Sequence, residues 1–140
     1  MQQISPIEAR LLASVDAAPM LAQVQAWSAV NTGTGNLAGL AEQAALLADA
    51  FAALPGTVTL EEPAPVTAVT ADGREVPVAH GRHVVVRVRP DASRRFLLTG
   101  HMDTVFAVDH PFQRQTWLDA DTLNGPGVTD MKGGIAVILA

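Results

Sequence analysis

Apolar positions recur at helical spacing over two stretches in the first half of the chain. Between residues 5 and 30 they fall three and four positions apart, which predicts one or two helices, with Pro19 as a break or first-turn residue. Residues 31–36 are rich in turn-forming residues and predict a loop. The clearest helix follows over residues 37–54, and Pro55 and Gly56 end it.

After Gly56 the pattern changes to short segments rich in β-branched residues. Four strands are predicted, at residues 57–60, 66–70, 83–89 and 95–99. Asp72 and Gly73 predict a tight hairpin, and residues 90–93 predict a turn between the last two strands. Residues 96–98 are apolar without alternation, which is typical of a central strand covered on both faces.

The last third of the chain predicts a small hairpin and then an apolar helix. The hairpin pairs residues 115–118 with residues 122–123, and the helix begins near Met131. The helical pattern still runs at Ala140, where no glycine or basic last turn ends it. We therefore expect a longer domain of the α/β class, of which residues 1–140 are the first part.

Composition narrows the partners that this chain can have. With 140 residues, of which 49% are hydrophobic and 16% charged, it is long enough for one globular core. The net charge is -5 and the basic residues are scattered, so we expect no nucleic acid partner. The apolar stretches are too short to span a bilayer and the start does not resemble a secretory signal, so we expect a cytoplasmic protein without a membrane partner. Without cysteine, any metal must be held by histidine and carboxylate ligands.

The first group of residues that could carry chemistry follows the strand predicted at 95–99. His101 and Asp103 come directly after Gly100, and residues two apart on an extended chain point to the same side. A neutral imidazole is a good zinc ligand, and a nearby carboxylate can fix its tautomer. Taken alone, the pair would be interpreted as a surface histidine and aspartate in a turn.

The second group lies directly before the last helix. Asp130 stands among four glycines and a proline, a composition that implies close backbone approach. By itself Asp130 would be read as a helix N-cap. A nucleotide loop is not expected, because Asp130 occupies the place of the third glycine and no Gly-Lys-Ser/Thr sequence follows.

Together the two groups resemble a known family. Gly-His-Met-Asp-Thr-Val at residues 100–105, followed by Asn-Gly-Pro-Gly-Val-Thr-Asp-Met-Lys-Gly-Gly at residues 124–134, is similar to the zinc hydrolases that include glutamate carboxypeptidase, aminoacylase, acetylornithine deacetylase and succinyl-diaminopimelate desuccinylase. The glutamate carboxypeptidase branch is the most similar. Residues 28–36 and the helix after them resemble the N-terminal region of this family more loosely.

The resemblance implies a fold and a set of site residues. The fold would be a three-layer α/β sandwich around a mixed β-sheet, zinc-exopeptidase-like, with the remainder of the catalytic domain and the dimerisation domain absent from residues 1–140. His101 would bind one zinc ion, Asp130 would bridge two, and Asp103 would act in the catalytic site behind His101. Cobalt or manganese are alternatives to zinc. The family also implies a cis peptide bond between Asp130 and Met131.

The resemblance further implies an amide or peptide hydrolase acting through a metal-bound hydroxide. Its substrate would be a small peptide or an N-acyl amino acid, and the full-length parent would be a homodimer. The general base and the remaining ligands of the family lie further along, so the alternative is an inactive fragment or binding module. Other conspicuous side chains are left outside the predicted site: Lys132 as a support of the glycine loop, Trp27 and Trp117 as packing residues, and His80, His83 and His110 as exposed or loop residues.

Overall fold

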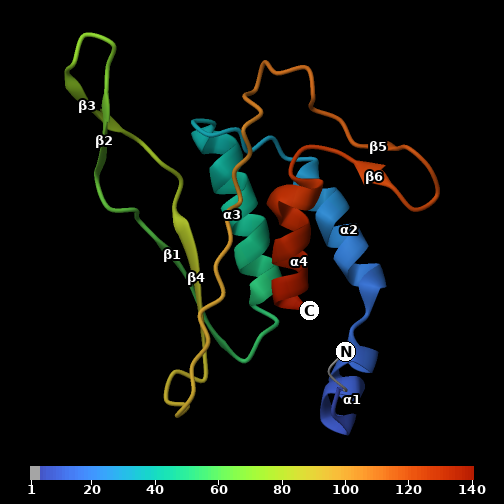
Figure 1. The fold of residues 1–140 in the computed structure, drawn as a ribbon. Coiled ribbons are helices and arrows are strands. Elements are labelled where there is room, and N and C mark those ends of the chain that lie inside the picture. Colours follow the sequence, from blue (N-terminus) through green and yellow to red (C-terminus); the bar gives the residue numbers. More distant parts are fainter. Residues whose placement is uncertain (1–3) are drawn as a thin grey trace.

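Four α-helices, one short π-helical segment (Val128–Gly133) that is kinked at Asp130 and Met131, and three two-stranded antiparallel sheets make up the computed structural model over residues 4–140, the part of the chain that it describes (Figure 1). The helices are α1 (Pro6–Ser14), α2 (Ala17–Ser28), α3 (Leu37–Phe51) and α4 (Gly134–Leu139). The strands are β1 (Gly56–Glu61), β2 (Val66–Val69), β3 (Glu75–Val78), β4 (His83–Val88), β5 (Thr116–Trp117) and β6 (Leu123–Asn124).

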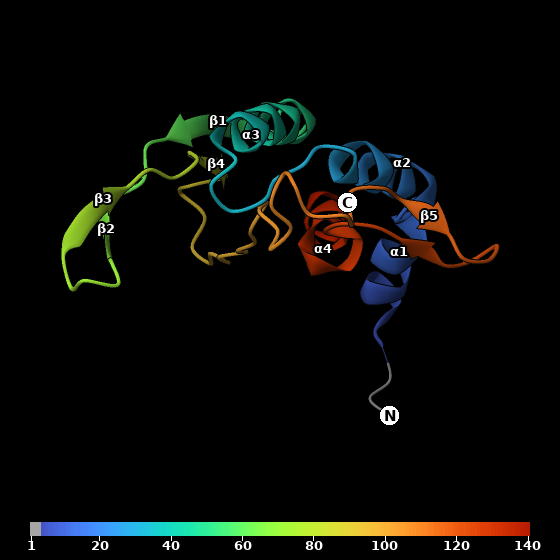
Figure 2. The ribbon, with the colours of Figure 1, turned by 90° about the horizontal axis from the view of Figure 1, so that it is seen from above.

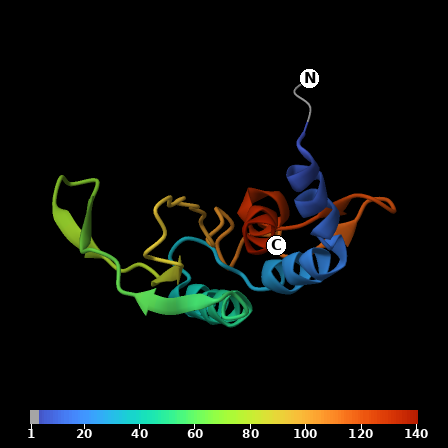
Figure 3. The ribbon, with the colours of Figure 1, turned by 90° about the horizontal axis from the view of Figure 1, so that it is seen from below.

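The first three helices begin at capping residues that the chain provides locally. Ser5 and Glu8 form a capping box at α1, and the Asp16 carboxylate accepts from the Ala18 N–H at the start of α2. Pro19 lies in the first turn of α2, as predicted. Helix α1 buries no side chain; it lies beyond the lower end of α2 in Figure 1 and projects at a steep angle to α2 in Figures 2 and 3.

The hydrophobic core lies where α2, α3 and α4 meet. Its buried members are Val24, Trp27, Leu47, Phe51, Ile135 and Ala136. The packing role predicted for Trp27 is confirmed, since only 3% of the residue is exposed. Trp117 on β5 is 46% exposed and takes no part in this core. The small core follows from the apolar stripes of three helices rather than from a sheet.

Strands β1 and β4 pair along their full length, with Gly56 opposite Val88 and Glu61 opposite His83. Helix α3 packs on this pair. The turn predicted at Asp72 and Gly73 is present, and Gly73 has φ +82°. It joins β2 to β3 rather than to β4, and β3 was not predicted. Pro77 interrupts the sequence pattern expected of a strand. A proline is nevertheless tolerated in β3, because one edge of each strand in a two-stranded sheet has no hydrogen-bonding partner.

The prediction of a strand at residues 95–99 is wrong, because the structure has no strand there. The segment is extended but pairs with no other described segment, and 88% of Phe96 and 87% of Leu97 are exposed. An apolar run signals a preference for burial, whereas a strand also needs a neighbouring edge to satisfy its backbone groups. The described residues therefore form an α/β arrangement without a central mixed sheet, and the three-layer sandwich is not confirmed. Among these residues, no helix is long and apolar enough to cross a membrane.

Candidate functional site

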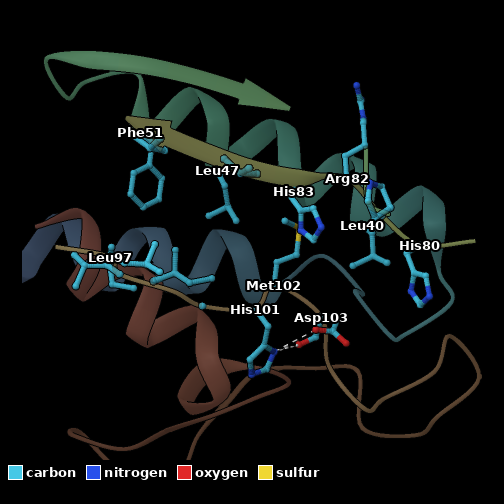
Figure 4. Close-up of a pocket in the computed structure, with 18 of the residues that line it drawn as sticks. Leu40, Leu47, Phe51, His80, Arg82, His83, Leu97, His101, Met102 and Asp103 are labelled. Carbon is cyan, nitrogen blue, oxygen red and sulfur yellow. Dashed lines mark hydrogen bonds and ion pairs between the residues drawn. The ribbon is translucent and has the colours of Figure 1, made fainter. Parts of the chain in front are cut away.

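His101 and Asp103 lie on one side of the chain, as the spacing predicted. The Nδ1 atom of His101 is 3.1 Å from the Asp103 carbonyl oxygen and 3.2 Å from the Asp103 Oδ1 atom (Figure 4). Two acceptors therefore face the same ring nitrogen. On this side of the ring, the two acceptors favour a neutral tautomer with the proton on Nδ1, which leaves a lone pair on Nε2.

Asp130 meets the other side of the same imidazole ring. Its Oδ1 atom is 2.9 Å from the His101 Nε2 atom, although 29 residues separate the two in the sequence. Asp130 is not a helix N-cap: its φ and ψ of -120° and 97° are not helical, and α4 begins only at Gly134. The peptide bond to Met131 is cis, as expected. The side chain of Asp130 is 86% exposed, so most of its carboxylate faces open space.

Lys132 ties the Asp130 loop to the end of α2. The residue is fully buried, and its Nζ atom donates to the carbonyl oxygens of Trp27 at 2.8 Å and Val30 at 2.9 Å. Burial lowers the pKa of Lys132 to about 8. The role that the sequence predicted for Lys132, to hold the glycine loop, is confirmed by these two hydrogen bonds.

A second set of hydrogen bonds ties the loop at residues 31–36 to the segment after His101. Thr104 donates from its N–H to the Thr32 carbonyl at 2.8 Å and accepts from the Thr34 N–H at 3.0 Å. The Asn31 amide donates to the Phe106 carbonyl at 3.1 Å. The loop and the segment after His101 therefore pair in a short parallel β-bridge, which fixes the backbone next to Asp103.

The electrostatic setting of His101 favours a protonated ring in the metal-free state. Burial alone would lower the pKa of His101, but the contacts with Asp130 and Asp103 outweigh it and raise the pKa above its usual value. All three of its near neighbours are acceptors. A cation that replaces the Nε2 proton would meet the same nitrogen and carboxylate donors.

Two cavities meet at this cluster, and His101 and Asp103 line both. The smaller cavity, of about 290 Å³, is also lined by Asp130, Phe106 and Phe112. The larger cleft, of about 830 Å³, lies between α3 and β4 on one side and residues 96–103 with α4 on the other (Figure 4). The cluster is thus open to a small molecule from two directions.

In kind and in position, the donors His101 Nε2 and Asp130 Oδ1 fit a zinc ion. Ligand atoms about 2.0–2.2 Å from a tetrahedral zinc lie roughly 3.4 Å from one another. The observed 2.9 Å is the hydrogen-bonded distance, so a shift of about half an ångström would admit the ion. Within residues 4–140, no group of three or more His, Asp or Glu side chains is arranged to hold a metal. This part of the chain supplies two donors and an incomplete coordination sphere.

The histidines left out of the predicted site stay apart from it. His80 and His83 are exposed and line the larger cleft, His83 on strand β4 rather than on a loop. The His110 ring lies 5.0 Å from that of Phe106, and its Nδ1 accepts from the Phe112 N–H.

Sequence reasoning missed Thr34, whose hydroxyl donates to Asp103, because no local pattern signals a partner 69 residues away.

Comparison with known proteins finds partial matches at low identity. No protein-family model matches the chain. It is 30% identical over 110 residues to carboxypeptidase G2 of Pseudomonas sp. (strain RS-16), a match that covers 79% of this chain and 24% of that protein. Over 70 residues it is 41% identical to the putative succinyl-diaminopimelate desuccinylase DapE of two Mycobacterium tuberculosis strains, covering 49% of this chain and 18% of each relative. The chain spans about a quarter or less of the length of the curated relatives it matches.

Proposed function

We propose that this chain contributes His101, Asp103 and Asp130 to the zinc centre of an amide- or peptide-bond hydrolase of the glutamate carboxypeptidase and desuccinylase family. The observation that carries the proposal is the approach of His101 Nε2 to Asp130 Oδ1 at 2.9 Å, with Asp103 behind the ring. The names of the relatives, a carboxypeptidase and a putative desuccinylase, support the same reaction class. Both cleave a bond between an acyl group and an amine.

Each residue has a task that follows from its contacts. Asp103 accepts from His101 Nδ1 and so keeps the Nε2 lone pair directed at the cation position. Asp130 offers an exposed carboxylate, whose two oxygens suit a bridge between two cations. Zinc, when bound, would polarise the scissile carbonyl and lower the pKa of a water molecule. The substrate would be a small peptide or an N-acyl amino acid.

The test is the zinc content and zinc affinity of the purified chain and of His101→Ala and Asp130→Ala. Matched controls are His80→Ala and Asp49→Ala, which remove an exposed histidine and an exposed aspartate that, among the described residues, form no hydrogen bond with His101, Asp103 or Asp130. We expect both site variants to lose most of the affinity and both controls to keep it. Hydrolysis of N-acyl amino acids and of peptides ending in glutamate is then measured with the same variants. Equal affinity in all five proteins would refute the assignment of His101 and Asp130.

The second candidate function is a non-catalytic binding module of the same fold. It is favoured by the presence of only two donors among the described residues. It predicts no zinc above background in the wild-type chain and no hydrolysis of either substrate class. Zinc binding that depends on His101 and Asp130 would therefore exclude this second candidate before any substrate is tried.

A further inference from the structure

The carboxylate of Asp103 accepts a hydrogen bond from a residue far away in the sequence. The Thr34 hydroxyl is 2.8 Å from Asp103 Oδ2 and 3.3 Å from the Thr104 carbonyl oxygen. A hydroxyl has one hydrogen to donate, and the shorter contact to a charged acceptor is the stronger one. With Oδ2 occupied by Thr34, the other oxygen, Oδ1, faces His101 Nδ1.

The position of Thr34 is itself set by backbone contacts. Its N–H donates to the Thr104 carbonyl at 3.0 Å, and the Thr104 N–H donates to Thr32. Gly33 lies so close to the opposite segment that a Cβ atom there would overlap the Phe106 carbonyl oxygen and come within 2.9 Å of the Ala107 Cα atom. The loop cannot move away from Asp103 without breaking this bridge, so the Thr34 hydroxyl is presented at a fixed place.

A continuous series of contacts thus runs from Thr34 to Asp130. It passes from Thr34 Oγ1 to Asp103 Oδ2, from Asp103 Oδ1 to His101 Nδ1, and from His101 Nε2 to Asp130 Oδ1. In a neutral ring only one nitrogen carries a proton. Nδ1 faces two acceptors of Asp103, its carbonyl oxygen at 3.1 Å and its Oδ1 atom at 3.2 Å, and Nε2 faces Asp130 Oδ1 at 2.9 Å, so the two aspartates compete for that proton.

We propose that Thr34 is a positioning residue: by fixing the rotation of the Asp103 carboxylate, it holds His101 in the tautomer that carries the proton on Nδ1. This tautomer leaves the Nε2 lone pair available to a metal ion, so the importance of Thr34 for zinc rests on the proposed function. Thr34 touches neither the ring nor the cation position. Partners of this kind behind a ligand fix its orientation and basicity.

The test measures the tautomer of His101 directly, in the metal-free chain. The ¹⁵N chemical shifts of the two ring nitrogens are recorded well above the pKa of the ring, for the wild type, Thr34→Val and Thr34→Ser. We expect the Nδ1–H form to predominate in the wild type and in Thr34→Ser, and the Nε2–H form to gain population in Thr34→Val. Thr59→Val is the matched control, because the exposed Thr59 also donates to a carboxylate, that of Glu61.

A second readout is the affinity for zinc alone, which we expect Thr34→Val to weaken by about tenfold or less, and Thr34→Ser to restore. Amide resonances of Thr104 confirm that the bridge survives the substitution. An unchanged tautomer ratio in Thr34→Val, with the bridge intact, would overturn the proposal. A shifted ratio in a chain that binds no zinc would leave the action of Thr34 on His101 standing and refute only the proposed metal function.

Discussion

Two successive segments of the chain, residues 95–99 and residues 101–107, are held in very different ways. The second is tied to the loop at residues 31–36 through both backbone groups of Thr104 and through Asn31. The first pairs with no other described segment and exposes Phe96 and Leu97 almost completely. Hydrogen bonds between two loops are therefore enough to arrange the candidate site. An apolar extended segment, in contrast, forms a strand only beside the edge of another strand, which satisfies its backbone groups.

The largest expected effect lies in the hydrogen-bonded part, at Lys132. Replacing Lys132 with Met removes both donors from the buried carbonyls of Trp27 and Val30. We expect the free energy of unfolding to fall by about 2 kcal/mol, since two unpaired buried acceptors cost more than is gained by no longer burying an ammonium group. Urea unfolding followed by circular dichroism measures the loss. Arg94→Met, at an exposed position, should leave stability unchanged; a similar loss in both variants would contradict the role of Lys132.

Gly33→Ala should break the bridge itself. The added Cβ atom would overlap the Phe106 carbonyl oxygen, which is part of the backbone and cannot swing aside. We expect a loss of about 1–2 kcal/mol in stability together with a shift of the His101 ring resonances. Gly73→Ala is the control, because it lies in the distant β2–β3 hairpin at φ +82° with open space around it. It should lower stability without moving the His101 resonances, and a silent Gly33→Ala would show that the loops are not in tight contact.

A change of pH should move stability and zinc affinity in opposite directions at His101. Because the pKa of His101 is raised in the folded chain, its ion pairs stabilise the metal-free protein fully below the unfolded value of about 6.5. That contribution disappears as the pH rises through the folded pKa. Zinc competes with the Nε2 proton, so its affinity should rise about tenfold per pH unit below that pKa and then level off.

Stability and zinc affinity are measured separately between pH 5 and pH 9. The difference in stability between the wild type and His101→Ala should shrink with increasing pH, while the zinc affinity of the wild type increases. If the stability difference and the zinc affinity changed with pH in the same direction, the proposal that His101 determines both would be contradicted.

The smallest effect is expected in the unpaired segment. Phe96→Ser exchanges a side chain on a residue that is already 88% exposed, so stability should change by less than about 0.5 kcal/mol. Hydrogen exchange should show the amides of residues 95–99 as unprotected and that of Thr104 as protected. A destabilisation of several kcal/mol would mean that Phe96 is buried in solution and that the two segments do not differ as described.

The sequence predicted local features well. Spacing identified α2 and α3, the loop between them and the β5–β6 hairpin, because each depends on residues near one another in the chain. The motif pair led to His101, Asp103 and Asp130, which the structure brings into contact. Long-range partners were not accessible in this way. The pairing of β1 with β4 and the position of β3 depend on register and on edges that a single strand does not encode.

By itself the sequence singled out the residues that we propose carry chemistry: an imidazole and two carboxylates, without a thiol, beside glycines that let the backbone approach closely. Only the tertiary structure decided how they are oriented. Lys132 reaches back across 105 residues to Trp27, and Thr34 reaches forward across 69 to Asp103. Such contacts follow from where the loops meet in space, because a hydroxyl or ammonium group finds its acceptor by distance and direction rather than by its place along the chain.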